Sequence, residues 1–232
     1  AALVAWADPA WRTERHASAF GERREVALAD GSHLTLDAST RVAVSWHLRS
    51  RRVALEAGRV RCAGAPSAWR PFALDAGAAR VRELGTVFDV DRQAGRVVVT
   101  VLRGRVRMDP AGADGGPGAV LVAGERAAAQ GSAASAVLGP VRSVGSGADG
   151  EAASAWTEGR LVFRATPLAE ALADLQRYRH GPLRVHGPEV AAMQLSGVFD
   201  AAQSDRVLDL LPRILPVVVD RQTDGSVDVR RR

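Results

Sequence analysis

Apolar and polar residues alternate along the chain from Glu22 to about Ala129. The alternation places apolar side chains on one face of a series of short strands, and these side chains are Val26, Leu28, Leu34, Leu36, Val42, Val44, Trp46, Val53 and Leu55. Pairs of residues that end in glycine, which tolerates the positive φ of tight turns, separate the strands at close intervals. No segment of this range has a helical period long enough to supply the crossovers of a parallel α/β sheet. The pattern predicts an all-β body.

A weak internal repeat runs through the same region. Three phrases share an order of strand, glycine and strand, and they read RRVALEAGRVRC, RPFALDAGAARVREL and RVVVTVLRGRVRM. Such a cadence is typical of stacked rungs. We therefore expect a β-solenoid or twisted β-roll rather than a sandwich.

A stretch that is poor in large hydrophobic residues follows the β body. It consists mostly of glycine, serine and alanine, a composition typical of flexible linkers. We therefore divide the chain into a leader segment at 1–20, a β domain at 21–130, a linker at 131–155 and a smaller module at 156–232.

The pattern changes again after Trp156, where strand and helix periods begin to alternate. Two helices are predicted, and we expect the hydroxyl groups of Thr166 and Ser204 to cap their first turns. The predicted order is strand, helix, strand, strand, helix, strand, strand, with a hairpin turn at Asp224-Gly225. This order predicts a small α/β module in which two helices lie on one sheet.

The charge balance has two explanations. The chain of 232 residues carries 31 basic side chains, all of them arginine, and 26 acidic ones, so its formal net charge is +5. A GC-rich genome, whose codons favour arginine, is one explanation, and nucleic-acid binding is the other. The arginines are interleaved with acidic residues, and no ladder of aromatic residues accompanies them for base stacking. We therefore expect no nucleic-acid partner.

The beginning of the chain is apolar but short. Every apolar stretch falls below the roughly 20 residues that a spanning helix needs. Ala1–Ala7, with Trp6 and Trp11 close by, has two interpretations: the last turns of an upstream transmembrane helix with an interfacial aromatic belt, or an amphipathic leader strand or tag remnant. Because methionine does not stand first, we expect a fragment or a processed form.

Motifs of catalytic and metal sites are weak throughout. Cys62 is the single cysteine, so no internal disulfide can form, and its strand-like surroundings predict a small buried hydrophobic residue. The run Gly145-Ser146-Gly147 lacks the strand and helix that a nucleophile elbow needs. The five histidines are dispersed, without the spacing of a zinc site. We therefore expect a protein that is not an enzyme and has no metal or cofactor.

Three aspartates in strand-like runs are the remaining candidates for acid–base chemistry, and they are Asp75, Asp89 and Asp91. Paired carboxylates in a β-helix can hydrolyse polysaccharides. Most such residues are instead outward-facing strand positions. A β-solenoid protein that binds or cleaves polysaccharide is therefore kept as the alternative function.

The segment Leu195 to Phe199, which reads LSGVF, holds a glycine between apolar residues. Glycine weakens side-chain packing in a strand but permits another backbone to approach closely. Two interpretations follow: a buried central strand, or a sheet edge that accepts a strand from a partner.

Several phrases resemble the periplasmic domain of FecR-type regulators, the membrane sensors of iron–siderophore signalling. The phrases LADGS, LGTVFDV and LVAGE recur in the expected order across about Gly21 to Ala128. The C-terminal stretch GRLVFRATPLAEALADLQRY, followed by LSGVF and LLPRILPVVV, looks like the STN module, a short domain found at the N-termini of secretins and TonB-dependent transporters, which ends these sensors.

The resemblance implies a signalling role without catalysis. Such regulators have a cytoplasmic domain that binds an extracytoplasmic-function (ECF) sigma factor, one helix through the inner membrane, and a periplasmic region. The periplasmic region meets the signalling domain of an outer-membrane TonB-dependent siderophore transporter. We therefore expect this chain to be the periplasmic region, with the cytoplasmic domain absent. The contact residues that we predict are Leu195, Ser196, Gly197, Val198, Phe199, Val217, Val218 and Val219.

Overall fold

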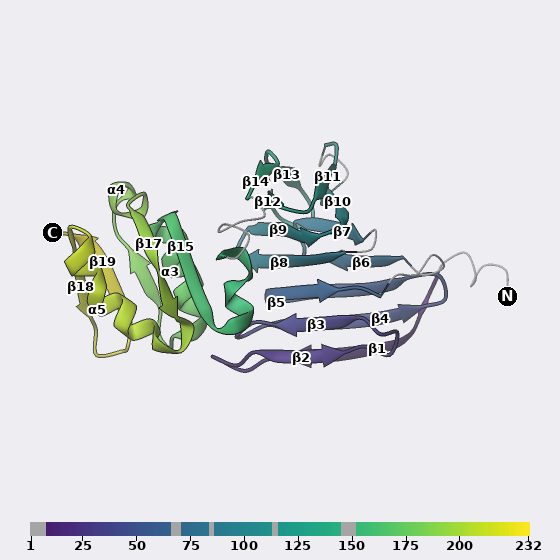
Figure 1. The fold of residues 1–232 in the computed structure, drawn as a ribbon, viewed down its shortest axis with the longest axis horizontal. Helices are drawn as coiled ribbons and strands as arrows, with labels where there is room; N and C mark the ends of the chain where they lie inside the picture. The colour runs from purple at the N-terminus through teal and green to yellow at the C-terminus, as the bar shows by residue number, and fades with distance from the viewer. Residues whose placement is uncertain (1–7, 66–70, 84–85, 113–115, 145–151) are drawn as a thin grey trace. The chain divides into compact units, whose positions relative to one another are not determined.

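The computed structural model describes residues 8–65, 71–83, 86–112, 116–144 and 152–232. The chain divides into two compact units, Ala1–Gly150 (unit 1) and Glu151–Arg232 (unit 2), and Figure 1 shows both. No helix in the described ranges is both long and apolar enough to cross a membrane.

Unit 1 is built of strands, which confirms the predicted all-β body. The strands are β1 (Ala10–Ala17), β2 (Arg24–Ala27), β3 (His33–Leu36), β4 (Arg41–His47), β5 (Arg51–Ala63), β6 (Phe72–Asp75), β7 (Ala79–Glu83), β8 (Val87–Gln93), β9 (Arg96–Arg103), β10 (Arg105–Pro110), β11 (Ala119–Val122), β12 (Glu125–Gly131), β13 (Ala136–Leu138) and β14 (Arg142–Ser143). They form one curled sheet with two halves. Sheet A contains β1, β4, β6, β7, β10 and β11, and sheet B contains β2, β3, β8, β9, β12, β13 and β14.

The long strand β5 belongs to both halves. Its first part pairs with β4 and β6 of sheet A, and its second part pairs with β3 and β8 of sheet B. Gly58 lies between the two parts with a φ of 92°, and a Cβ there would lie 2.2 Å from the Thr40 hydroxyl oxygen. Next to this glycine the register with β4 shifts, as in a β-bulge. The strands of the two halves therefore lie end to end in rows, for example β4 with β3 (Figure 1).

The core of unit 1 follows the predicted alternation. All nine apolar residues that the pattern placed on one face are buried and belong to a single cluster. Cys62 is also fully buried in it as a free thiol. The inward positions change from odd numbers (Val53, Leu55) to even numbers (Val60, Cys62) across Gly58, because the bulge adds one residue to the strand.

The solenoid part of the prediction is not supported. Rungs of such a solenoid would pair in parallel, whereas β5–β6 is the one parallel pairing among the described strands of unit 1. The three repeat phrases also have three different structures: the first is β5 itself, the second is the β6–β7 hairpin, and the third is β9 followed by β10 in the other half. The glycine of each phrase has a different role: it lies beside a bulge in the first, in a hairpin turn in the second, and between the two halves of the sheet in the third. The repeat of strand, glycine and strand therefore did not predict the fold.

Two predicted segment boundaries differ from the structure. The leader at 1–20 contains β1, which pairs with β4. The linker at 131–155 contains β13 and β14, which both pair with β12. Small residues make backbone ladder bonds as well as large ones do, so the composition of the stretch did not reveal β13 and β14. The rest of the predicted linker includes residues 145–151, which lie outside the described residues.

Unit 2 has the predicted order of elements. They are β15 (Arg160–Pro167), α3 (Leu168–Leu175), β16 (Leu183–Val185), α4 (Pro188–Ala191), β17 (Gln194–Asp200), α5 (Ser204–Ile214), β18 (Val217–Arg221) and β19 (Val227–Arg231), with short 3₁₀ turns η1 (Ala155–Glu158), η2 (Gln176–Tyr178) and η3 (Ala201–Gln203). The short helix α4 was not predicted.

The strands of unit 2 form two small sheets where one was expected. One sheet is β15–β17, and the other has the order β16–β19–β18. The helix α3 contacts strands of both sheets, and α5 contacts β17 and β18. The two helices therefore connect the sheets, and their buried residues are Leu168, Ala171, Leu172, Leu175, Ser204, Val207, Leu208 and Leu211.

Candidate functional site

The strand β17 holds five of the eight predicted contact residues. It pairs with β15 along one side, and no described strand pairs with its other side. Among the described strands β17 therefore lies at the edge of a two-stranded sheet, and the binding of a partner strand there stays a prediction. An edge strand presents unpaired backbone groups to which another strand can add.

Side chains of β17 alternate between the interior and the surface. Leu195 is 1% exposed, so it belongs to the interior of unit 2, whereas Val198 is 62% exposed. Ser196 also lies on the surface, where its hydroxyl oxygen accepts a hydrogen bond from the Ala165 amide at 2.9 Å. Of the five residues, Val198 therefore offers the largest apolar contact to a partner.

The surface of the β15–β17 sheet has an apolar centre with charges beside it. Val162 stands directly opposite Val198, and Arg160 stands opposite Asp200 at the end of the ladder. Side chains directly opposite in an antiparallel pair lie on the same face. The exposed Val198 and the half-buried Val162 therefore form one small apolar patch.

Gly197 has a packing role that the sequence did not reveal. It stands opposite Phe163, and the Phe163 and Phe199 rings lie 5.8 Å apart between centroids. A Cβ at Gly197 would lie 2.7 Å from the Phe199 ring. The glycine therefore makes room for an aromatic pair, where the sequence had suggested close approach of a partner backbone.

The strand β18 holds the other three predicted contact residues. It is also an edge strand, because it pairs with β19 alone among the described strands. Val217 is fully buried, and Val218 and Val219 are half-buried. Val217 can therefore offer a partner its backbone but not its side chain.

Charged pairs cover the outer face of the second sheet. Arg230 donates to Asp220 at 2.6 Å, and His186 Nε2 lies 2.8 Å from an Asp228 carboxylate oxygen. The contact with His186 holds the pKa of Asp228 below its ordinary value, despite an opposing effect of desolvation. This face is polar, so β17 is the better apolar docking strand.

The aspartates proposed for acid–base chemistry are held by arginines in unit 1. Asp89 accepts from Arg61 at 2.7 and 2.9 Å, and Asp91 accepts from Arg59 at 2.9 Å. These partners lie on the adjacent strand β5. Both carboxylates therefore serve as partners for largely buried guanidinium groups.

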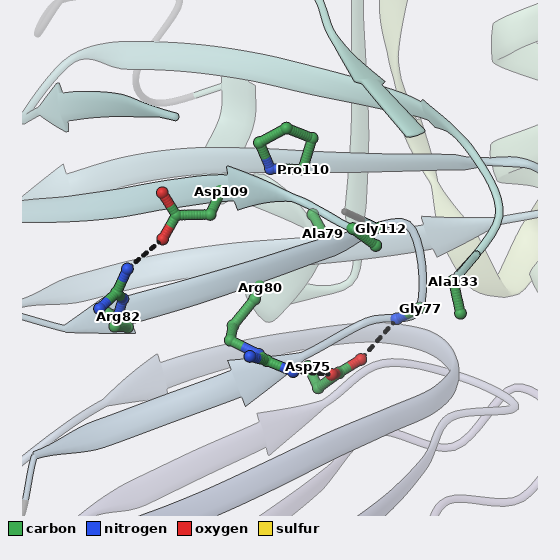
Figure 2. Close-up of a pocket in the computed structure, with 10 residues that line it drawn as sticks. Asp75, Gly77, Ala79, Arg80, Arg82, Asp109, Pro110, Gly112 and Ala133 are labelled. Atoms are coloured by element: carbon green, nitrogen blue, oxygen red, sulfur yellow. Dashed lines mark hydrogen bonds and ion pairs between the residues drawn. The ribbon is translucent and has the colours of Figure 1, made fainter. Parts of the chain in front are cut away.

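Asp75 lines a hollow of about 380 Å³ on sheet A, together with Arg80, Arg82 and Asp109 (Figure 2). Burial acts to raise the pKa of Asp109, but hydrogen bonds from Arg82 (2.6 Å) and Arg107 (2.9 Å) outweigh it and lower that pKa. A catalytic acid needs the opposite shift. The lowered pKa of Asp109 is therefore the opposite of what the general acid in glycoside cleavage needs.

Metal binding has no candidate among the described residues, because no group of three or more histidine, cysteine, aspartate or glutamate side chains lies close enough to hold an ion.

Most of unit 1 matches a known protein family. Residues 14–107 match the family model described as FecR protein, which confirms the resemblance seen in the β body. No curated protein matches the chain.

Two crystal structures of a candidate anti-sigma factor from Parabacteroides distasonis ATCC 8503 share the fold. At 20% sequence identity each, one has a TM-score of 0.77 and covers 95% of this chain and 100% of its own. The other has a TM-score of 0.76 and covers 94% and 99%. The fold of both units therefore occurs in another protein.

Proposed function

We propose that this chain, which has a FecR region at residues 14–107, is the periplasmic part of a signalling regulator and works by binding another protein. The FecR match supports a regulatory and non-enzymatic role. The candidate anti-sigma factor from Parabacteroides distasonis, which shares the fold, is consistent with that role.

The partner that we propose is the N-terminal signalling domain of an outer-membrane TonB-dependent siderophore transporter. The regulator would pass the ligand state of the transporter to an ECF sigma factor through one inner-membrane helix and a cytoplasmic domain. A partner shifts a sensor only when it binds two states with different affinity. Docking would therefore have to favour one state of the periplasmic region.

Unit 2 is the proposed docking unit. The helices α3 and α5 connect a two-stranded and a three-stranded sheet, and the full order is β15, α3, β16, α4, β17, α5, β18 and β19. This arrangement supports the proposal of an STN-like module. The observation that carries the docking proposal is the unpaired side of β17 with Val198 exposed on its surface. An added strand would gain main-chain hydrogen bonds, and Val198 with Val162 would provide the apolar contact.

The proposal is tested by placing a single charge on β17. Val198→Asp should weaken binding of the cognate signalling domain at least tenfold, because association would bury an unpaired carboxylate. Pull-down with a panel of isolated transporter signalling domains identifies the partner, and titration calorimetry then measures the affinity. The matched control is Val137→Asp on β13, since Val137 is 71% exposed in unit 1.

Three results would contradict the proposal. The first is that no signalling domain binds the unmodified chain. The second is equal binding by the Val198→Asp and Val137→Asp variants. The third is loss of the native circular dichroism spectrum in Val198→Asp, which would make Val198 a residue of the core.

A further inference from the structure

The edge strand β1 carries polar residues where the sheet faces the core. Its register with β4 places Arg12, Glu14 and His16 opposite the core residues Trp46, Val44 and Val42. No residue of β1 belongs to the hydrophobic cluster of unit 1. Inward-pointing charges are a known feature of edge strands. The strand is therefore held by its backbone ladder and by polar contacts.

Glu14 makes the central polar contacts of β1. Its carboxylate accepts a hydrogen bond from the Trp46 indole at 2.8 Å and lies 3.1 Å from the Arg12 guanidinium. Both contacts are at the edge of the sheet, where Glu14 keeps 26% of its side chain exposed. Removing the strand from β4 would return the Glu14 carboxylate, the Arg12 guanidinium and the Trp46 indole N–H to water.

Asp8 fastens the beginning of the strand to the turn between β4 and β5. One carboxylate oxygen accepts from the Arg49 amide at 2.9 Å, and the other accepts from the Ser50 hydroxyl at 2.7 Å. The Asp8 carbonyl oxygen lies 2.5 Å from Nδ1 of the buried His47. Because a carbonyl can only accept, that nitrogen carries the hydrogen.

The electrostatics of Asp8 agree with this fastening. Hydrogen bonds from Ser50 and Arg49 lower its pKa, despite desolvation, and the charges of His47 and Arg52 act in the same direction. The carboxylate is therefore ionised at neutral pH and bonds as a charged acceptor. Its backbone has a φ of 44°, a left-handed conformation that ordinary residues adopt only at a cost.

We propose that Asp8 is a latch, and that β1 is a releasable strand that opens as a unit while the core of unit 1 stays closed. Segments with few apolar contacts open at lower free energy than the core does. Opening of β1 would uncover the side of β4 that it now pairs with and would make that side available to another strand.

Hydrogen exchange measured by mass spectrometry on the full chain tests the latch. In the unmodified protein, peptides from β1 should exchange faster than peptides from β8 and β9. Asp8→Asn and Ser50→Ala remove the latch from its two sides, and each should speed β1 exchange about tenfold because a charged hydrogen bond is lost. Asparagine adopts the left-handed φ of this position as readily as aspartate does, so Asp8→Asn removes the charge without adding backbone strain.

The matched control is Asp224→Asn, a carboxylate whose hydrogen bond is to Ser226 in its own turn in unit 2. It should leave β1 exchange unchanged. The latch is refuted if β1 and β8 exchange at one common rate in the unmodified protein, because β1 would then open only with the core. It is refuted as well if the two latch variants leave β1 unchanged, or if they speed exchange in β8 and β9 equally.

Discussion

At the scale of single residues, Arg51 is a buried charge that is held by several partners. It keeps only 5% of its side chain exposed and donates to the Asp30 carboxylate, to the Ser32 hydroxyl at 3.2 Å and to the Ala65 carbonyl at 3.1 Å. Its guanidinium also lies 5.7 Å from the centroid of the Phe72 ring. A buried charge is tolerated only with such partners.

The sequence could not predict this arginine site. Alternation identifies inward positions by hydrophobicity, and Arg51 occupies an inward position of β5 with a charge. Its acidic partner lies 21 residues away, and the pairing depends on how strands that are distant in sequence come together. Valine and leucine positions were predicted correctly, because their burial needs no specific partner.

The Asp30–Arg51 pair should make folding depend on pH. Burial acts to raise the pKa of Asp30, but hydrogen bonds from Ser32 and Arg51 lower it overall. A carboxylate with a lowered folded-state pKa contributes stability above its unfolded pKa of about 3.9, and this contribution is lost as the pH falls through the folded value. Asp30→Asn should cost about 2 kcal/mol at pH 7 and less at pH 3.

Urea unfolding at pH 7 and at pH 3 measures this difference. The control is Asp75→Asn, because Asp75 forms a pair with Arg80 in which both side chains are more than half exposed. The exposed pair should contribute no more than about 1 kcal/mol at either pH. Equal costs for the two variants at pH 7 would contradict the assigned role of Asp30.

At the scale of elements, helical periodicity predicted the faces of the helices better than their ends. Val207, Leu208 and Leu211 are buried along α5 as expected. The predicted caps are wrong. Thr166 accepts from the Arg164 amide in the strand before α3, and Ser204 donates its hydroxyl hydrogen to the Tyr178 carbonyl. A hydroxyl near a helix start has several backbone partners within reach, and tertiary packing selects among them.

The faces of α5 give a matched pair of variants. Leu208 is fully buried and Leu210 is 41% exposed, two positions later on the same helix. Leu208→Ala should lower the free energy of unfolding of unit 2 by about 2–5 kcal/mol, since it leaves a cavity. Leu210→Ala should change it by less than about 1 kcal/mol. Urea denaturation followed by circular dichroism compares them, and similar losses would mean that the helix faces are assigned wrongly.

At the scale of the whole molecule, family phrases were more informative than periodicity. The phrases LADGS and LGTVFDV lie within the residues 14–107 that the family model matches, whereas LVAGE lies after them and the strand topology was not predicted. Periodicity fixes which residues point inward, but it says nothing of which strands pair. Strand order and sheet number therefore had to come from the structure in both units.

Unit 2 should fold as a separate protein. Its buried residues come from every one of its helices and from both of its sheets. Trp156 is its single tryptophan and is 2% exposed, so the tryptophan fluorescence of the isolated unit reports on the packing around this residue. Residues 152–232 expressed alone should unfold in urea in one transition that coincides in fluorescence and circular dichroism. Separate transitions, or emission typical of an exposed indole, would contradict this expectation.

The strand that runs through both halves of unit 1 has a consequence for sequence variation. Deleting one residue from β5 before Gly58 would reverse which side chains of that part point inward, while the part after Gly58 kept its original orientation. Only loss of the bulge next to Gly58 could restore the pairing with both neighbours at once. Homologous chains should therefore tolerate changes of length in the connections between strands and keep β5 at constant length, so that an alignment can be anchored on this one strand.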